Sequence, residues 1–314
     1  MSSVVTPYEI LYGVMAVEGV GVGSVTDRVK GTGVTVVILP EGARGAVDIA
    51  GGAPATRETP VLDPTNTIPG PDAVVLSGGS ALGLQTADGV ANALRELNRG
   101  VCVGSARIPI VVAAAIFDMD VGLSEPPTID DGSRALRMAA QLEQRVEEGR
   151  FGAGTGATVG KSLGTAARMN SGQAAVTLKT HDGLIVSALL VVNAVGSILD
   201  ENGEIIAGPR IDDVPQSTTA LWAMATGNFS TGRATTIGLI ITNAGLSKSE
   251  LGRVARMAHD GLGRSIDPVH TPWDGDTLFV ASVGDRSEDA GRVGALSAHA
   301  VTIAVRRAVK AGIN

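Results

Sequence analysis

The chain has 314 residues and a formal net charge of −7, and 44% of its residues are hydrophobic but only 3% are aromatic. This length supports one large domain or two ordinary ones, with a core built mainly from Val, Ala, Ile and Leu. The negative charge, with no basic run longer than Arg306-Arg307, argues against a nucleic-acid-binding protein.

Two further exclusions concern disulfides and membranes. Cys102 is the single cysteine, so a disulfide framework is excluded, and we expect a buried structural thiol because no His or Lys is near it in sequence. Residues 1–17 contain acidic Glu9 and no basic region before a long apolar block, so no signal peptide is expected. No window reaches the roughly 18 apolar residues of a membrane span. A soluble cytoplasmic protein is therefore expected.

Short apolar runs bounded by turn residues predict strands in the first hundred residues. Residues 34–39 form such a run, and residues 46–49 follow a Pro-Glu-Gly turn, which predicts a hairpin. A further strand over 73–77 leads into an amphipathic helix over 81–98. Gly100 lies just beyond this helix and is expected to end it.

The middle of the chain combines an ambiguous run, a helix and a hairpin. Residues 108–117 are apolar, and their periodicity does not distinguish strand from helix. The apolar stripe over 133–148 predicts an amphipathic helix ended by Gly149. Strands over 174–178 and 184–193, joined by a His-Asp-Gly turn, predict a hairpin.

An irregular segment over 208–234 stops abruptly at a strongly apolar strand that begins with Thr235. Loops of that length are uncommon in compact proteins and are often functional. A threonine at this junction becomes an N-terminal nucleophile if the peptide bond from Ala234 breaks. Its hydroxyl then attacks an amide carbonyl, and its freed α-amine acts as the base.

The C-terminal part adds two helices around one strand. Ser247-x-x-Glu250 is a capping box that opens a helix. Residues 277–283 predict a strand, and the Ala- and Val-rich residues 289–311 predict a long helix. Antiparallel hairpins separated by Ala-rich helices favour a layered α/β/β/α arrangement over a doubly wound parallel sheet. We expect a single domain over residues 1–314.

Several motifs fail as cofactor or metal sites. The glycine-rich segment 152–162 has Thr155 where a P-loop requires its first glycine. This segment instead suggests close approach of backbone to a site, with Lys161 projecting into it, and a solvated surface lysine is the alternative. The four histidines are scattered without metal-binding spacing, so we expect no metal and no cofactor. No nucleophile elbow of the Gly-x-Ser-x-Gly type is present.

Two polar patterns are candidates for chemistry. Asp274 and Asp276 flank one glycine just before an apolar strand. In an extended segment both side chains leave on one face, where a water-poor cleft raises the pKa of one carboxyl or the pair binds an ammonium group. The alternative is an exposed, inert turn. Asn193 ends an apolar strand, and its amide N–H suits either an oxyanion hole or a turn cap.

Long motifs in a consistent order resemble those of the DmpA-like peptidases. That family includes aminopeptidases with D-amino-acid esterase and amidase activity, β-peptidyl aminopeptidases and hydrolases of 6-aminohexanoate (nylon) oligomers. The resemblance extends from about Val20 to Ala311, nearly the whole chain. The segments that carry it are 31–37, 44–59, 76–84, 87–90, 107–111, 152–161 and 270–277.

The resemblance implies an α+β fold in which four layers, α/β/β/α, resemble the N-terminal-nucleophile hydrolases with different strand connectivity. It also implies self-cleavage between Ala234 and Thr235, which gives parts 1–234 and 235–314. A homo-oligomer, often a tetramer, is a further implication. The residue before the nucleophile departs from the family, in which Asn or Gly is frequent.

The resemblance also implies roles for individual residues. The nucleophile falls on Thr235, the asparagine that supports the oxyanion on Asn193, the lysine near the site on Lys161, and the paired aspartates on Asp274 and Asp276. This combination resembles the nylon-oligomer branch more than the β-peptide branch, which prefers serine.

Three functions follow from these observations. The first is a self-processing amidohydrolase that cleaves short peptides or amide oligomers. The second is an acyltransferase of the ornithine acetyltransferase type on a similar fold, in which an amine replaces water as acyl acceptor. The third is a ligand-binding protein that never cleaves itself.

Overall fold

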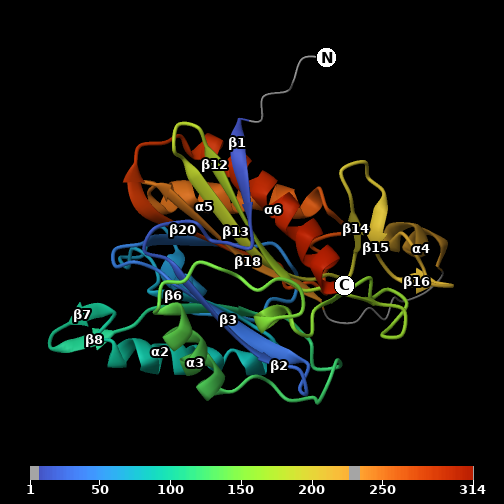
Figure 1. The fold of residues 1–314 in the computed structure, drawn as a ribbon, viewed down its shortest axis with the longest axis horizontal. Coiled ribbons are helices and arrows are strands. Elements are labelled where there is room, and N and C mark those ends of the chain that lie inside the picture. The colour runs from blue at the N-terminus through green and yellow to red at the C-terminus, as the bar shows by residue number, and fades with distance from the viewer. Residues whose placement is uncertain (1–6, 226–233, 314) are drawn as a thin grey trace.

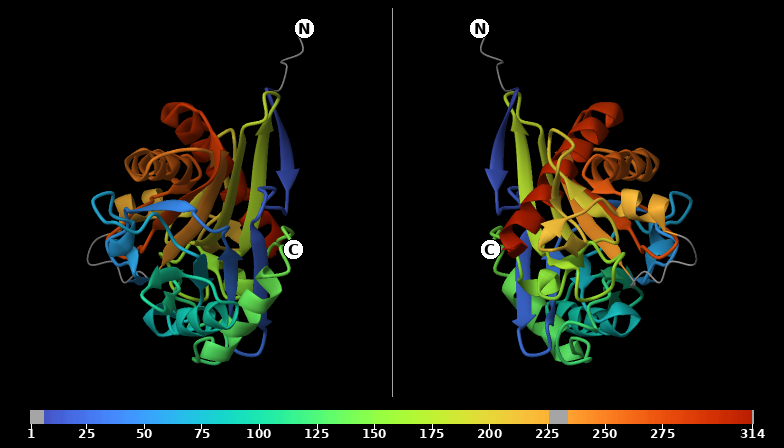
Figure 2. Two further views of the ribbon diagram at one scale, coloured as in Figure 1. Left: turned by 90° about the vertical axis from the view of Figure 1, so that its left-hand side faces the viewer. Right: turned by 90° about the vertical axis from the view of Figure 1, so that its right-hand side faces the viewer.

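Two β-sheets stack face to face in this protein, and a pair of helices covers the outer face of each sheet (Figure 1, Figure 2). The computed structural model describes residues 7–225 and 234–313. The predicted irregular segment includes residues 226–233, and the segment 1–17, in which no signal peptide is expected, includes residues 1–6. Both stretches lie outside the described residues.

The larger sheet has six strands in the order β1-β12-β13-β18-β20-β4. Its strands are β1 (Tyr8–Tyr12), β12 (Gln173–Thr180), β13 (Ile185–Asn193), β18 (Thr235–Ala244), β20 (Thr277–Arg286) and β4 (Arg44–Ile49). Neighbours are antiparallel except for the central pair β18 and β20, which is parallel. The candidate nucleophile therefore begins a central strand.

The second sheet has five strands in the order β2-β3-β6-β9-β5. Its strands are β2 (Gly21–Asp27), β3 (Thr32–Ile38), β6 (Ala73–Ser77), β9 (Val111–Ala115) and β5 (Thr56–Arg57). Only β6 and β9 are parallel neighbours. The ambiguous apolar run at 108–117 is thus largely strand.

The helices form the two outer layers. Helices α5 (Lys248–Gly263) and α6 (Ala290–Ile313) pack on the six-stranded sheet, and α2 (Thr86–Glu96) and α3 (Ile129–Ala139) pack on the five-stranded sheet. A third apolar core fills the space between the sheets. These layers confirm the predicted α/β/β/α arrangement.

Alternation along β18 decides which way the nucleophile points. Ile237, Leu239 and Ile241 pack in the core between the sheets, whereas Ile240 packs against the α5–α6 layer. Because strand side chains alternate with a period of two, Thr235 faces the space between the sheets. The site therefore lies between the β-layers.

Smaller elements lie around these layers. The short helices are α1 (Ser80–Gly83), α4 (Thr218–Met224), η1 (Thr59–Leu62) and η2 (Gly152–Gly154). The short strands are β7 (Val101–Val103), β8 (Ala106–Ile108), β10 (Thr158–Val159), β11 (Met169–Asn170), β14 (Ser197–Leu199), β15 (Ile205–Ala207), β16 (Arg210–Ile211), β17 (Val214–Pro215) and β19 (Ile266–Asp267).

Several local predictions are wrong. Residues 34–39 and 46–49 do not form a hairpin, because β3 pairs within the five-stranded sheet and β4 pairs with β20 in the other. The helix predicted over 133–148 spans α3 instead. Beyond it Leu142 has a φ of +59°, and Val146 donates its N–H to the Gly13 carbonyl.

The thiol of Cys102 is exposed, not buried, because the β7–β8 hairpin that carries it lies at the periphery of the molecule (Figure 1). The helix predicted over 81–98 is also interrupted. Its residues form α1 and α2, and Asn98, rather than Gly100, adopts the left-handed conformation just after the C-cap of α2. Asparagine tolerates that conformation at a helix end.

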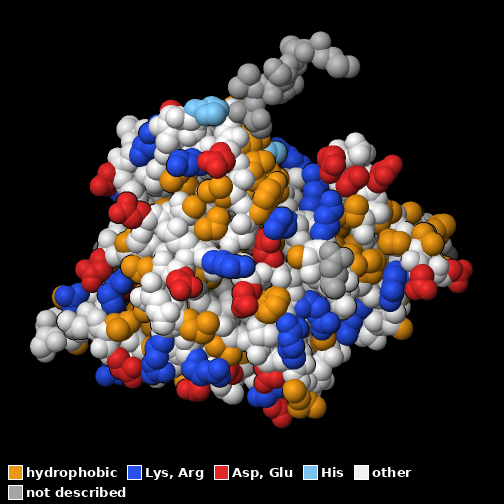
Figure 3. Space-filling view, viewed as in Figure 1, with side chains coloured by type: hydrophobic (Ala, Val, Ile, Leu, Met, Phe, Trp, Pro, Cys, Tyr) orange, Lys and Arg blue, Asp and Glu red, His pale blue; other side chains and the backbone are white. Residues whose placement is uncertain are grey.

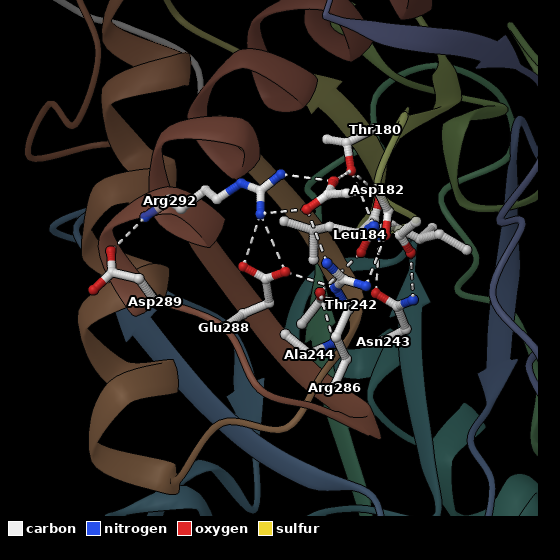
Figure 4. Close-up of polar contacts among 12 residues, drawn as sticks. Thr180, Asp182, Leu184, Thr242, Asn243, Ala244, Arg286, Glu288, Asp289 and Arg292 are labelled. Atoms are coloured by element: carbon white, nitrogen blue, oxygen red, sulfur yellow. Dashed lines mark hydrogen bonds and ion pairs between the residues drawn. The ribbon is translucent and has the colours of Figure 1, made fainter.

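A polar network lies at the C-terminal end of β18, at the other end of the strand from Thr235 (Figure 4). The Asp182 carboxylate, in the β12–β13 turn, accepts hydrogen bonds from Arg292 at 2.8 and 2.9 Å and from Arg286 at 2.9 Å. Asn243 accepts from the Ile185 N–H at 2.9 Å. These contacts connect the hairpin, β18, β20 and α6, so the register of the central strands is set at both ends.

No described helix is long and apolar enough to cross a membrane. Charged side chains of both signs are distributed over the face seen in Figure 3, among scattered apolar ones.

Substitution of glycine by alanine at two positions of α5 should change the free energy of unfolding in opposite directions. A Cβ at Gly261 would lie 2.2 Å from the Ala298 carbonyl oxygen of α6, whereas a Cβ at Gly252 meets nothing within 4 Å. Gly261→Ala should lower the free energy of unfolding by about 1–3 kcal/mol through overpacking. Gly252→Ala should raise it by roughly 0.5–1 kcal/mol through helix propensity. Chemical denaturation of both variants checks this, and equal effects would contradict the α5–α6 packing.

Candidate active site

Thr235 lies at the first position of β18, directly opposite Asn193 at the end of β13. Its side chain is buried, and its hydroxyl donates a hydrogen bond to the carbonyl oxygen of Ala234. The hydroxyl is thus held at the peptide bond that would have to break to release Thr235 as an N-terminus.

The peptide bond after Ala234 is fixed by the loop that precedes β20. The Ala234 N–H donates to the Trp273 carbonyl at 3.3 Å, and the Gly275 N–H donates to the Ala234 carbonyl at 3.0 Å. Ala234 and Asp274 form an isolated parallel bridge. The Ala234 carbonyl therefore accepts both the Thr235 hydroxyl and a backbone N–H, and the latter polarises it toward nucleophilic attack.

Gly275 is the residue that this close approach requires. A Cβ at position 275 would lie 2.8 Å from the Thr235 hydroxyl oxygen and 2.8 Å from the Ala53 carbonyl oxygen. Residues 50–53 in turn hold the aspartate turn, since the N–H groups of Ala50 and Gly51 donate to the Asp276 carbonyl and that of Ala53 donates to the Asp274 carbonyl. The glycine between the two aspartates is thus part of the site.

Lys161 is buried beside Asn193, with 5% of its surface exposed. Its ammonium donates to the Asn193 Oδ1 at 2.7 Å and to the Asn193 carbonyl at 3.2 Å. The alternative of a solvated surface lysine is therefore wrong. Gly160, at φ +72°, makes the turn possible, because a Cβ there would lie 2.1 Å from the Gly208 carbonyl carbon.

Burial lowers the pKa of Lys161 to about 7, against the opposing effects of the carboxylates of Asp120 and Asp274. Removing the ammonium from water disfavours its charged form, and the nearby carboxylates offset only part of that cost. A substantial fraction of Lys161 is therefore neutral near pH 7, and a neutral amine can accept a proton.

The carboxamide of Asn193 is extensively hydrogen-bonded. Its Oδ1 accepts from Lys161 and, at 3.0 Å, from the Thr158 N–H, while its Nδ2 donates to the Phe117 carbonyl at 3.1 Å. Asn193 thereby connects the glycine-rich segment to the end of β9. The bond to Phe117 uses one of the two amide hydrogens of Asn193. The predicted role of Asn193 in supporting an oxyanion stays a prediction.

The two aspartates of the turn accept different donors. Asp274 accepts from the N–H of Thr271 at 3.0 Å, from the Thr271 hydroxyl, and from the Val195 N–H at 3.4 Å. Burial first, and the neighbouring Asp276 carboxylate second, raise the pKa of Asp274 to about 6. The alternative of an exposed turn is wrong, because both side chains are buried. The raised pKa agrees with the expected water-poor cleft, and the binding of an ammonium group stays a prediction.

Asp276 connects the strand of the nucleophile to a histidine that the sequence interpretation missed. Its Oδ1 accepts from the Thr236 N–H at 2.7 Å, and its Oδ2 accepts from His270 Nδ1 at 2.7 Å. Both His270 and Thr271 lie within the motif over 270–277, so the signal was present. Only the aspartates of that motif were interpreted as site residues.

Asp118 is a second residue that sequence reasoning missed. It is buried at the end of β9, where it accepts from the Gly79 N–H and the Thr32 hydroxyl, each at 2.7 Å. Burial raises the pKa of its carboxyl to about 6. A Cβ at Gly78 would lie 2.2 Å from Asp118 Oδ2, so the sequence leaves room for this carboxylate.

Within residues 7–225 and 234–313, no group of three or more His, Cys, Asp or Glu side chains is arranged to hold a metal ion. What the described residues do assemble is a hydroxyl, a polarised carbonyl and a buried lysine with a lowered pKa. This set suits nucleophilic attack on an amide.

Comparison with known proteins agrees with this geometry. The sequence profile of peptidase family S58 matches residues 13–313. An uncharacterised aminopeptidase of Mycobacterium tuberculosis is 42% identical over 262 residues, which cover 80% of this chain and 73% of that protein. The 6-aminohexanoate-oligomer endohydrolase of Kocuria sp. is 32% identical over 324 residues, which cover 93% of this chain and 84% of that enzyme.

Solved structures share the fold. A β-aminopeptidase of Burkholderia sp. superposes with a TM-score of 0.68 at 18% identity, over 94% of this chain and 84% of that chain. The L-aminopeptidase D-Ala-esterase/amidase of Ochrobactrum anthropi, described as a new variant of the N-terminal-nucleophile hydrolase fold, gives 0.65 at 18% identity, over 94% and 85%. The fold class predicted from the sequence is thereby confirmed.

The buried lysine predicts a pH-dependent effect on stability. Because the pKa of Lys161 falls from 10.5 to about 7 on folding, its burial destabilises the protein fully below pH 7, and this penalty disappears as the pH rises toward 10.5. Lys161→Met should therefore raise the free energy of unfolding more at pH 6 than at pH 10, by more than about 1 kcal/mol.

The matched control is Lys179→Met on β12, because Lys179 is exposed and has no burial penalty to relieve. Denaturant titrations at the two pH values measure both variants. A Lys161→Met effect that is the same at pH 6 and pH 10 would contradict a buried lysine with a lowered pKa.

Proposed function

The chain belongs to peptidase family S58 and is a hydrolase of peptide or amide bonds, and we propose that Thr235 is its nucleophile, released by self-cleavage after Ala234. The observation that carries this proposal is the contact between the Thr235 hydroxyl and the Ala234 carbonyl, which also accepts the Gly275 N–H. A threonine that began a strand for structural reasons alone would not need this arrangement.

Self-cleavage proceeds by an N-to-O acyl shift. The Thr235 oxygen attacks the Ala234 carbonyl carbon, the C–N bond breaks, and the proton of the hydroxyl ends on the departing nitrogen, which becomes the α-amine. Water then hydrolyses the ester and leaves a carboxylate on Ala234. The Gly275 N–H stabilises the oxyanion that forms on the way, a contribution typically worth roughly 3–4 kcal/mol.

A base other than the α-amine is required for that first step, because the amine does not exist until the bond is broken. Lys161 suits this role, because its pKa of about 7 leaves a neutral fraction near pH 7. Its amine also contacts the side chain of Asn193, which is the residue paired with Thr235 across the sheet. General bases are most effective when their pKa is near the working pH.

After maturation the α-amine of Thr235 takes over as base. Its unperturbed pKa of about 7.7–8.0 leaves a useful neutral fraction. The Thr235 oxygen attacks the substrate amide, the amine passes the proton to the leaving group, and water releases the acyl-enzyme. In this proposal the second amide hydrogen of Asn193 supports the oxyanion, and Asp274 and Asp276 position the threonine or bind a substrate ammonium.

Short peptides or amide oligomers are the proposed substrates, in keeping with the aminopeptidase and the oligomer endohydrolase among the relatives. The acyltransferase alternative is not favoured, since those relatives are hydrolases by name. A homo-oligomer, a tetramer by family resemblance, and a cytoplasmic location both stay predictions.

Substitution of Thr235 tests the proposal directly. Thr235→Ala should give one uncut, folded and inactive chain, because neither self-cleavage nor turnover has a nucleophile. Thr235→Ser, which retains a hydroxyl, should still cleave itself and retain activity. Denaturing gels, circular dichroism and an amide-hydrolysis assay measure these outcomes. Thr235→Ala protein that is cut or active would overturn the assignment.

A further inference from the structure

His270 holds the carboxylate that contacts the strand of the nucleophile. Its Nδ1 lies 2.7 Å from Asp276 Oδ2, and its backbone N–H donates to the same oxygen at 3.2 Å. The other oxygen, Oδ1, accepts from the Thr236 N–H at 2.7 Å. Building on the proposed role of Thr235, we propose that His270 is a positioning residue that orients the nucleophile through Asp276.

The register of the sheet explains why this carboxylate matters. Strands β18 and β20 are parallel, and their pairing begins with Ile237 opposite Thr277. One residue earlier, the Thr236 N–H donates to the side chain of Asp276. Asp276 thus extends the pairing to the residue that follows Thr235, and any rotation of its carboxylate would release that peptide.

Three donors, divided between the two carboxylate oxygens, oppose such a rotation. Asp276 is 1% exposed, so its carboxylate depends on protein donors rather than water. The Thr236 N–H restrains one oxygen and His270 restrains the other. Thr271, the next residue, donates its N–H and hydroxyl to Asp274 instead. Consecutive residues of one loop therefore hold the two aspartates separately, and His270 is specific for Asp276.

The backbone of His270 has an uncommon conformation. Its φ of +56° is in the left-handed region, which non-glycine residues rarely adopt, although Asn, Asp and His adopt it more often than the others. Such conformations persist only where the surrounding structure holds them, most often at functional sites. In this conformation both the backbone N–H and the imidazole of His270 contact Asp276 Oδ2.

The imidazole of His270 packs against a second histidine, which lies on α5. The His259 ring of α5 packs edge-on against the His270 ring with centroids 4.8 Å apart. His259 is 7% exposed, and its Nε2 lies 3.2 Å from the Asp48 carbonyl oxygen on β4. The imidazole of His270 is therefore held between the helix layer and Asp276.

Two substitutions separate the hydrogen bond from other effects. His270→Asn tolerates the left-handed backbone and retains a side-chain N–H donor. His270→Ala removes the side-chain donor and leaves only the backbone N–H. His299→Ala is the matched control, because His299 is also partly buried and hydrogen-bonded, to Tyr8 at 2.7 Å. It lies on α6 beside the edge strand β1, away from β20 and Asp276.

The experiment measures self-cleavage by pulse-chase in vitro translation, which needs no external substrate, and kcat and KM on L-alanine p-nitroanilide. His270→Ala should slow self-cleavage and lower kcat at least tenfold, with KM changed less than twofold. His270→Asn should stay within threefold of the unsubstituted protein on both rates, and His299→Ala should match it.

Three results would overturn the proposal. One is His270→Ala protein with normal rates, and another is an equal loss in the Asn and Ala variants that retain the normal melting temperature. If His270→Ala does not fold, the third result is His270→Asn protein that folds but cleaves itself more than ten times more slowly than the unsubstituted protein. Thr235→Ala protein that still cuts itself would instead contradict the proposed function. If Thr235→Ala stays uncut and His270→Ala cleaves itself and turns over substrate at normal rates, only the role of His270 is contradicted.

Discussion

The pairing of residues 234–236 with the Asp-Gly-Asp turn is the constraint on which the site depends. Through it the Ala234 carbonyl accepts the Gly275 N–H, and the Thr236 N–H reaches the Asp276 carboxylate. Thr235 lies between these two anchored peptides, so its hydroxyl has little freedom. The two stacked sheets, the parallel β18–β20 pair and the 50–53 segment all serve to hold this turn against the start of β18.

Burial of charge is the second determinant of the chemistry. Lys161, Asp118 and Asp274 are all nearly inaccessible to water, and burial is the main cause of each pKa shift. The shifts bring the lysine and the two carboxyls to pKa values between about 6 and about 7. Groups that titrate near neutral pH can exchange protons with a reacting threonine, and this is a common property of active sites.

Local patterns in the sequence predicted the β12–β13 hairpin and the capping box of α5, because these depend on neighbours within a few residues. The layers were predicted from the order of hairpins and Ala-rich helices and from the family resemblance. The partners of β3 and β4 were mispredicted, since sheet membership depends on distant strands. The helix over 133–148 failed because the chain near Leu142 turns to pair with the N-terminal segment. Family resemblance identified the lysine and the aspartates. His270 lies in the same motif over 270–277 but was not interpreted as a site residue, whereas the contacts of Asp118 with Thr32 and Gly79 join residues distant in sequence.

Intact-mass spectrometry of the purified wild-type protein under denaturing conditions, with N-terminal sequencing of the smaller species, tests the central claim most directly. The account predicts two polypeptides, residues 1–234 and 235–314, and a new N-terminus at Thr235. Protein that hydrolyses amides while it remains one continuous chain, or a cut at any other bond, would contradict it.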